Sequence, residues 1–157
     1  MKITIIWTGD TSEKYLQTGI SEYIKRLKHY TKLEIVELNY LKNAKSLSEA
    51  EIKNRESEQT IQKLTPSDYV VILDEGGEEM KSMKFASFVQ KHSVNGTRNL
   101  VFIIGGAYGF SNELYAKAQY KMSLSQMTFS HQMIRLIFLE QLYRAYTIIK
   151  GEPYHHE

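Results

Sequence analysis

Residues 99–110 read NLVFIIGGAYGF, an apolar run that passes directly into a glycine-rich segment. A short apolar run that ends at glycine is typical of a buried strand. Glycine at this point lets a ligand approach the backbone, because no Cβ is in the way. The G-G-x-x-G spacing matches neither the dinucleotide-binding G-x-G-x-x-G nor a P-loop, so those two functions have little support. A tight turn that binds nothing is the alternative interpretation.

Strand and helix patterns alternate outward from this segment along the whole chain. Strands are predicted at residues 2–8, 33–38, 68–74, 99–104 and 120–125. Helices are predicted to begin after the N-cap residues Ser12, Ser48, Ser82 and Ser130, and a short helix is predicted at 111–118. The last helix is predicted to end at Gly151. Because several strands are continuously apolar, we expect one α/β domain over residues 1–157, with a mostly parallel sheet and helices on both faces. Ligands of such sheets bind beyond the carboxyl ends of the strands, here the loops after residues 73, 104 and 125.

The composition excludes several kinds of site. The chain has no cysteine, which rules out disulfides, thiolate metal sites and a cysteine nucleophile. The apolar start MKITIIWTG is too short for a secretion signal or a membrane span, so we expect a cytoplasmic protein that contacts no membrane. A net charge of +2 is modest, so RNA binding would need a local basic patch or a dimer. Lys25, Arg26 and Lys28, followed by His29 and Lys32, form one such patch, although cations there also complement a helix dipole.

The segment LSQMTFSHQMIR, residues 124–135, is a second candidate site. It joins the last predicted strand to the last helix and offers backbone groups for an adenine edge and apolar side chains for its faces. Packing of Met127 and Phe129 in the core is the alternative interpretation. His131 falls in the first helical turn, where a structural role is the alternative to a functional one.

The final helix and the tail carry the remaining candidates. Glu140 and Arg144 stand four residues apart and can pair along one helix face, which is also a common surface arrangement. Arg135 and Arg144 are each able to bind a phosphate. The tail EPYHHE supplies an aromatic ring for stacking on a base and two imidazoles that titrate near neutral pH, or it is simply flexible.

The opening MKITII, the segment VFIIGGAYGF and the stretch SLSQMTFSHQMIRLIFLEQLYRAYTIIKGEPYH together resemble the RlmH family. These enzymes are the smallest knotted (SPOUT) methyltransferases and methylate N3 of a pseudouridine in 23S ribosomal RNA, at position 1915 in helix 69. The resemblance covers essentially the whole chain. It implies a trefoil knot near the C-terminus, S-adenosylmethionine (SAM) as methyl donor without a metal, a ribosomal substrate, and a homodimer whose two subunits complete each active site.

The resemblance also implies roles for individual residues. The positions that match the family's SAM-binding residues are Leu73, Gly105, Leu124, Ser125, Gln126, Met127, Thr128 and Phe129. The candidate catalytic residues are His155, as base or proton acceptor, Tyr154, which stacks on or hydrogen-bonds the target base, and Arg144 and Glu140. The candidate RNA-contacting residues are Arg135, His131, Lys25, Arg26 and Lys28.

Two other functions stay open at this point. One is a related knotted methyltransferase that modifies a different nucleotide of ribosomal or transfer RNA. The other is a ribosome-binding or assembly factor that has the same scaffold and no catalytic activity. Binding of SAM separates the second from an enzyme.

Overall fold

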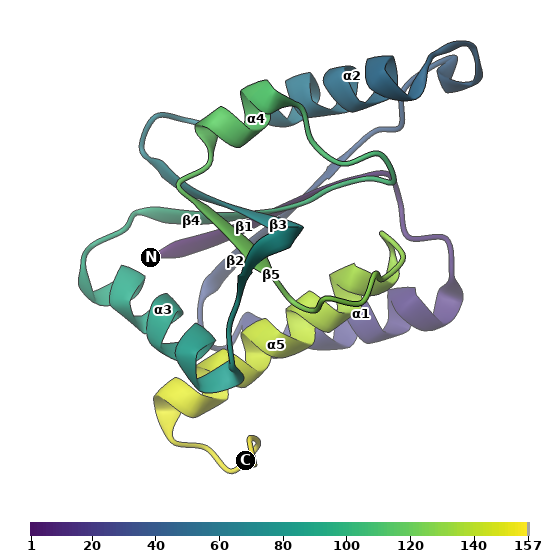
Figure 1. Cartoon of the computed structure of the whole chain (residues 1–157). Coiled ribbons are helices and arrows are strands. Elements are labelled where there is room, and N and C mark those ends of the chain that lie inside the picture. Colours follow the sequence, from purple (N-terminus) through teal and green to yellow (C-terminus); the bar gives the residue numbers. More distant parts are fainter. Residues whose placement is uncertain (157) are drawn as a thin grey trace.

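The computed structural model describes residues 1–156 and contains one five-stranded sheet (Figure 1). All strand pairs are parallel and the strand order is β2-β1-β4-β3-β5. The strands are β1 (Lys2–Thr8), β2 (Lys32–Leu38), β3 (Asp68–Glu79), β4 (Asn99–Ile104) and β5 (Tyr120–Ser123). The helices are α1 (Lys14–Leu27), the short 3₁₀ helix η1 (Ala44–Ser46), α2 (Glu49–Ile61), α3 (Ser82–Val94), α4 (Asn112–Lys117) and α5 (Met133–Lys150). The predicted α/β class and largely parallel sheet are confirmed.

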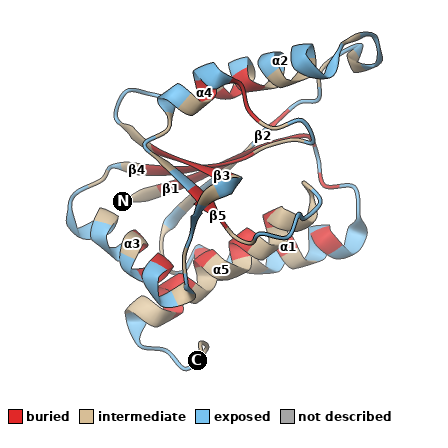
Figure 2. Ribbon diagram, in the orientation of Figure 1, coloured by how far each residue is buried: buried red, intermediate tan, exposed pale blue. Residues whose placement is uncertain are grey.

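Helices cover both faces of the sheet, with α1, α3 and α5 on one face and α2 and α4 on the other (Figure 1). The side chains of β4 alternate between the two layers. Leu100, Phe102 and Ile104 pack under α1, α3 and α5, whereas Val101 and Ile103 pack under α2 and α4. Buried residues therefore fill the central strands (Figure 2). This two-sided burial is the physical reason for the continuous apolar run NLVFII at residues 99–104.

The strand β3 is longer than the sequence predicts. The segment EGGEE was expected to be a loop, but β3 continues through an irregularity between Leu73 and Glu78 and ends at Glu79. Gly77 makes this possible, because a Cβ there would lie 2.7 Å from the backbone of Lys121 and Met122 on β5. A close approach of two backbones selects glycine, and glycine is normally read as a strand breaker. The two neighbouring glycines concealed the extension.

Two predicted helix caps are confirmed. Ser48 accepts a hydrogen bond from the backbone N–H of Glu51 at the start of α2 (3.1 Å). Gly151 ends α5 in the left-handed conformation at φ 70°, and the N–H of Glu152 donates back to the carbonyl of Thr147 (2.9 Å). Ser130 also accepts from the N–H of Met133 (3.1 Å), although α5 itself begins only at Met133. Local capping chemistry is readable from sequence because both partners are neighbours in the chain.

Two other predicted caps are wrong. The N-cap residues of α1 and α3 are Glu13 and Lys81, and neither side chain makes a capping hydrogen bond. The Ser12 backbone N–H donates to the side-chain oxygen of Gln132 (2.9 Å), and the Ser82 hydroxyl donates to that of Gln141 (3.0 Å). Both serines therefore tie α1 and α3 to the α5 region. Within residues 1–156, no helix is long and apolar enough to cross a membrane.

Candidate functional site

Three loops meet at the carboxyl edge of the sheet and enclose a cavity of about 340 Å³. The first is the irregular stretch of β3 after Leu73, and the other two follow β4 at Ile104 and β5 at Ser123. These are the three places that the parallel-sheet rule predicts. The lining residues are Leu73, Asp74, Glu75, Ile104, Gly105, Gly106, Ala107, Gly109, Phe110, Ser123, Leu124, Ser125, Met127, Thr128, Phe129, His131 and Ile134. The volume falls in the ordinary range of small-molecule sites, roughly 300–1,000 Å³. Of the predicted SAM-binding residues, only Gln126 does not line the cavity; it is exposed in the same loop.

The glycine loop is held by its own aromatic residue and by α2. A Cβ on Gly105 would lie 2.7 Å from the ring of Phe110, so only glycine leaves room for this ring beneath the cavity. The Ser111 N–H donates to the hydroxyl of Ser57 on α2 (2.9 Å), and both residues are buried. The loop is therefore fixed at both ends. It forms a tight turn, and its glycines also line the cavity.

The loop after β5 is shaped by serine side chains. The Ser123 hydroxyl donates to the carbonyl of Ser125 (2.9 Å), whose own hydroxyl accepts from the N–H of Met127 (2.9 Å). This folding turns Met127 and Phe129 outward, and they are 76% and 37% exposed. Packing of these two side chains in the core, the alternative interpretation, is therefore wrong. They stand at the cavity as apolar surfaces.

A second cluster of candidate residues lies on the outer side of α5, where the tail folds back. Arg144 forms an ion pair with Glu140 and donates to Nδ1 of His155 (3.3 Å). The Tyr154 hydroxyl donates to Glu140 (3.1 Å) and lies 3.3 Å from the hydroxyl of Tyr23 on α1. Burial, and then the bond with Tyr23, raise the pKa of Tyr154. The four candidate catalytic residues thus form one hydrogen-bonded group.

Residues of α1, of the turn after it and of α5 hold this tail in place. The Tyr30 hydroxyl donates to the carboxylate of Glu152 (2.5 Å), and this bond raises the pKa of Tyr30 to about 12. The ring of Tyr143 meets that of Tyr154 nearly edge-on at 4.7 Å, and the guanidinium of Arg26 lies 5.4 Å from the Tyr143 ring. Such contacts favour one position of the tail. The basic patch at Lys25, Arg26 and Lys28 therefore adjoins the tail, with Lys25 and Lys28 exposed.

The cavity and the tail cluster do not meet within one chain. Ile134 lines the cavity, and Glu140 follows six residues later on α5, about 9 Å along the axis and about 120° around it. The side-chain hydrogen-bond partners described for Tyr154 and His155 are Tyr23, Glu140 and Arg144, and none of these lines the cavity. In Figure 1 the C-terminal end lies at the bottom, away from the 124–130 loop at the right.

Arg135 has a different role from the RNA contact that the sequence suggests. Its side chain is 1% exposed, and its guanidinium donates to the carbonyls of Thr8 and Gly9 and to the hydroxyl of Thr11 at 2.8–3.0 Å. It also lies over the ring of Trp7, 5.0 Å from the centroid. A phosphate cannot reach a guanidinium in this position. Arg135 instead fixes the loop between β1 and α1, which corrects the expectation.

Comparison with known proteins agrees with this architecture. The family described as "Predicted SPOUT methyltransferase" matches residues 1–155. The chain belongs to the SPOUT methyltransferase family. The protein named ribosomal RNA large subunit methyltransferase H from Bacteroides fragilis is 52% identical over 157 residues, and the match covers all of both chains. The protein of the same name from Flavobacterium psychrophilum is 50% identical with the same coverage.

Two solved structures share the fold of this chain at low sequence identity. A probable methylase family protein from Haemophilus influenzae superposes with a TM-score of 0.53 at 13% identity, over 99% of this chain and 70% of that one. A probable methyltransferase from Bordetella pertussis gives a TM-score of 0.54 at 9% identity, over 92% and 93%. At these identities the likeness concerns the fold alone.

The cavity of this SPOUT methyltransferase has the chemistry that SAM requires. Backbone groups of the glycine loop and of residues 124–129 can meet the adenine edge, and Leu73, Phe110 and Ile134 give it apolar walls. Asp74 and Glu75 supply negative charge for a cationic donor. Within residues 1–156, no cluster of three or more potential metal ligands is present.

Sequence reasoning missed several residues of this SPOUT methyltransferase site. Asp74 and Glu75 line the cavity, and their only sequence signal was their place directly after the buried strand VVIL. The ring of Tyr23 packs against the core from α1, as an apolar residue would, but its hydroxyl contacts that of Tyr154. His131 was a candidate RNA contact, and it lies in the cavity wall, where burial and then Arg135 lower its pKa.

Proposed function

We propose that this SPOUT methyltransferase transfers a methyl group from SAM to N3 of a pseudouridine in helix 69 of the large-subunit ribosomal RNA. It acts in the cytoplasm, on the ribosome and as a homodimer. The observation that carries the proposal is the cavity, whose walls include seven of the eight residues expected to bind SAM, among them Leu73, Gly105 and Phe129. Relatives about 50% identical over their whole length, named ribosomal RNA large subunit methyltransferase H, support the substrate class.

Methyl transfer from SAM depends mainly on alignment of the attacking N3 with the methyl group, because this group is already activated. When bound, SAM supplies an activated methyl group that a nucleophile displaces. The N3–H of the base must lose its proton for the nitrogen to attack, and negative charge then spreads to the carbonyl oxygens O2 and O4. The protein therefore has to align the nucleobase with the cavity. It can then lower the barrier through a general base that takes the N3 proton, or through hydrogen-bond donors that stabilise the charge on O2 and O4.

The tail cluster supports a donor role for His155. Arginine can only donate, so Nδ1 of His155 accepts from Arg144 and the ring proton sits on Nε2. Nε2 is buried and makes no hydrogen bond within the described residues. In this tautomer His155 offers an N–H to a carbonyl oxygen of the target base, and it becomes a proton acceptor only after Arg144 moves away. Tyr154 adds a ring that can stack on the base.

A second chain resolves the separation between the cavity and the tail. In a dimer, the tail of one subunit reaches the cavity of the other, and the two Lys25–Arg26–Lys28 patches are combined on one particle. Burying SAM between two chains also excludes water from the reacting atoms. The family resemblance further predicts a knotted backbone near the C-terminus, and this stays a prediction.

The direct test uses ribosomal large subunits from a strain that lacks the gene. Incubation with purified protein and SAM should add one methyl group to a helix 69 pseudouridine, as mapped by mass spectrometry of RNA fragments. His155→Ala should lose turnover and keep SAM affinity, and the adjacent His156→Ala serves as the matched control. His155→Gln, which keeps an N–H donor, should retain part of the activity if His155 donates and none if it is the base.

Mixing two inactive variants tests the shared site. Gly105→Val fills the cavity, because its side chain meets Phe110, and His155→Ala disables the tail. Heterodimers of the two variants should recover activity through one intact site. Absence of recovery would mean that each chain completes its own site. A methyl group on another nucleotide would assign a related substrate, and wild-type protein without SAM binding would indicate a ribosome-binding factor without catalysis.

A further inference from the structure

Asp74 lies within β3, directly after the buried residues of this strand, and its carboxylate is held on both sides. One oxygen accepts from the hydroxyl of Tyr115 on α4, and the other accepts from the backbone N–H of Gly76 (2.7 Å). The two oxygens therefore have separate partners on different elements. Asp74 also lines the cavity, so this fixed carboxylate is part of its wall.

Tyr115 is itself fixed in place. Its ring meets that of Phe110 nearly edge-on at 5.7 Å, and the ammonium of Lys121 lies 5.4 Å from its centroid. Burial, and then the bond to Asp74, raise the pKa of the Tyr115 hydroxyl, so the hydroxyl keeps its proton and donates. Tyr115 does not line the cavity, and acts on it only through Asp74. It is a positioning residue.

The charged side chains that line the cavity are acidic. Asp74 and Glu75 are its acidic residues, and no lysine or arginine lines it in the part of the chain that the structure describes. His131 is the basic residue among the lining set, and burial lowers its pKa, which favours the neutral form. The walls of the cavity therefore carry negative charge without a facing cation.

We propose that Asp74, positioned by Tyr115, makes the cavity select a positively charged sulfur centre over a neutral one. The inference rests on the proposed function. SAM carries a sulfonium. When the methyl group leaves, the electron pair of the S–CH₃ bond stays on sulfur, the new N–CH₃ bond forms, and the N3 proton passes to solvent water or to a general base of the site. The product S-adenosylhomocysteine lacks both the methyl group and the positive charge, and a carboxylate in the cavity wall attracts only the charged form. Asp74 thereby favours both donor binding and product release.

Calorimetry with three ligands tests this charge selection. SAM and sinefungin carry a positive charge at the reacting centre, as sulfonium and ammonium, and S-adenosylhomocysteine carries none. Asp74→Asn keeps the shape of the side chain and removes its charge. We expect SAM and sinefungin to bind about tenfold more weakly to this variant, with S-adenosylhomocysteine changed by less than about twofold.

Two further variants distinguish charge from folding. Glu113→Gln removes an exposed carboxylate from the same helix as Tyr115 and should change none of the three affinities. Tyr115→Phe should lower affinity for the two charged ligands by a smaller factor, because Asp74 keeps its charge and loses one restraint. Thermal melting confirms that each variant is folded.

The outcomes separate cleanly. Equal weakening of all three ligands in folded Asp74→Asn would mean that Asp74 only shapes the cavity, and the inference would be wrong. Unchanged affinities would refute it as well. If the wild-type chain bound none of the three ligands, the proposed function would fail and the inference with it. Selective loss of affinity for the charged ligands would establish the charge selection, and the substrate would still be tested by RNA mapping.

Discussion

Replacing Arg135 with methionine tests whether this residue supports the fold or contacts RNA. The guanidinium is 1% exposed and makes three hydrogen bonds, of 2.8, 2.9 and 3.0 Å, to the end of β1 and the loop that follows it. Methionine keeps a similar length and apolar volume but cannot donate. The carbonyls of Thr8 and Gly9 would then lose their partner.

The expected loss follows from these contacts. Hydrogen bonds from a charged donor contribute roughly 1.5–3 kcal/mol each, so three give about 5–9 kcal/mol. Burying the guanidinium costs several kcal/mol, on the order of 4, and methionine recovers this cost. The net effect is a destabilisation of about 3 kcal/mol, a large part of the stability of a small domain.

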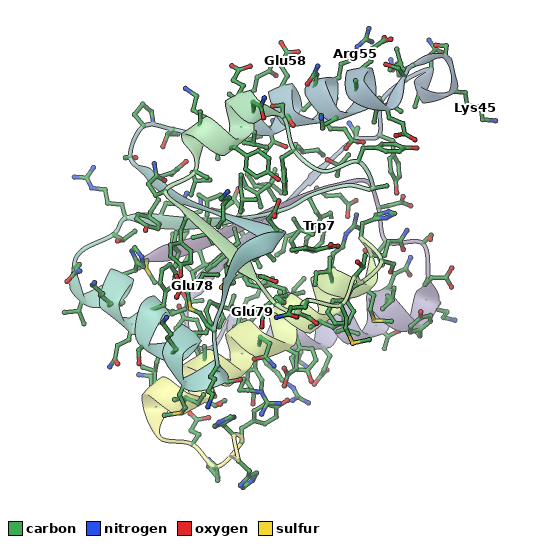
Figure 3. All side chains as sticks on the ribbon, viewed as in Figure 1. Trp7, Lys45, Arg55, Glu58, Glu78 and Glu79 are labelled. Carbon is green, nitrogen blue, oxygen red and sulfur yellow. The ribbon has the colours of Figure 1, made fainter. Side chains whose placement is uncertain are left out.

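Urea unfolding followed by circular dichroism measures this difference, at one fixed protein concentration so that dimerisation does not change between samples. The matched control is Arg55→Met, because Arg55 is exposed on the outer side of α2 and points to solvent together with Lys45 and Glu58 (Figure 3). Arg55→Met should change stability by less than about 0.5 kcal/mol. Wild-type stability in Arg135→Met, combined with weaker ribosome binding, would refute the structural role and restore the RNA contact.

Three more changes give sharp expectations. Tyr23→Phe removes the hydroxyl beside that of Tyr154 and should lower kcat several-fold with SAM affinity unchanged in calorimetry; unchanged kcat would exclude a positioning role. Gly77→Ala forces a Cβ into the backbone of β5 and should cost about 2 kcal/mol or more by thermal melting, against about 1 kcal/mol for Gly96→Ala, which meets open space at φ +77°. Burial lowers the pKa of His92, so the unfolded chain binds a proton first as pH falls and stability is lost below about pH 6.5. Urea midpoints at about pH 7.5 and about pH 5.5 should therefore differ less in His92→Gln than in the wild type.

The location of the cavity was predictable because it depends on local patterns. An apolar run predicts each buried strand, and a parallel sheet brings the carboxyl ends of all strands to one edge. This rule predicts that the loops after residues 73, 104 and 125 lie together, and the family resemblance supplied the individual residues Leu73, Gly105 and 124–129. The position of Asp74 in that wall was equally local, but a single aspartate after a strand is too common to identify.

Contacts between distant segments were not predictable. The partner of the Ser12 backbone and hydroxyl is Gln132, and Arg135 bonds the end of β1, in each case more than 100 residues away. A serine that caps a helix and a serine that bonds a distant segment look the same in the sequence, so only the folded structure distinguishes them. The surface role expected for Arg135 failed for this reason.

By itself, the amino-acid sequence determined the order of strands and helices, the two-sided burial of the sheet and the edge at which a ligand binds, because all three follow from periodicity and from neighbours along the chain. Tertiary structure alone decided which polar groups are buried, that β3 extends past Gly77, and that Tyr154 and His155 lie against Tyr23 and Arg144 instead of in the cavity. These outcomes depend on which distant surfaces meet when the chain closes on itself, and no local pattern encodes that.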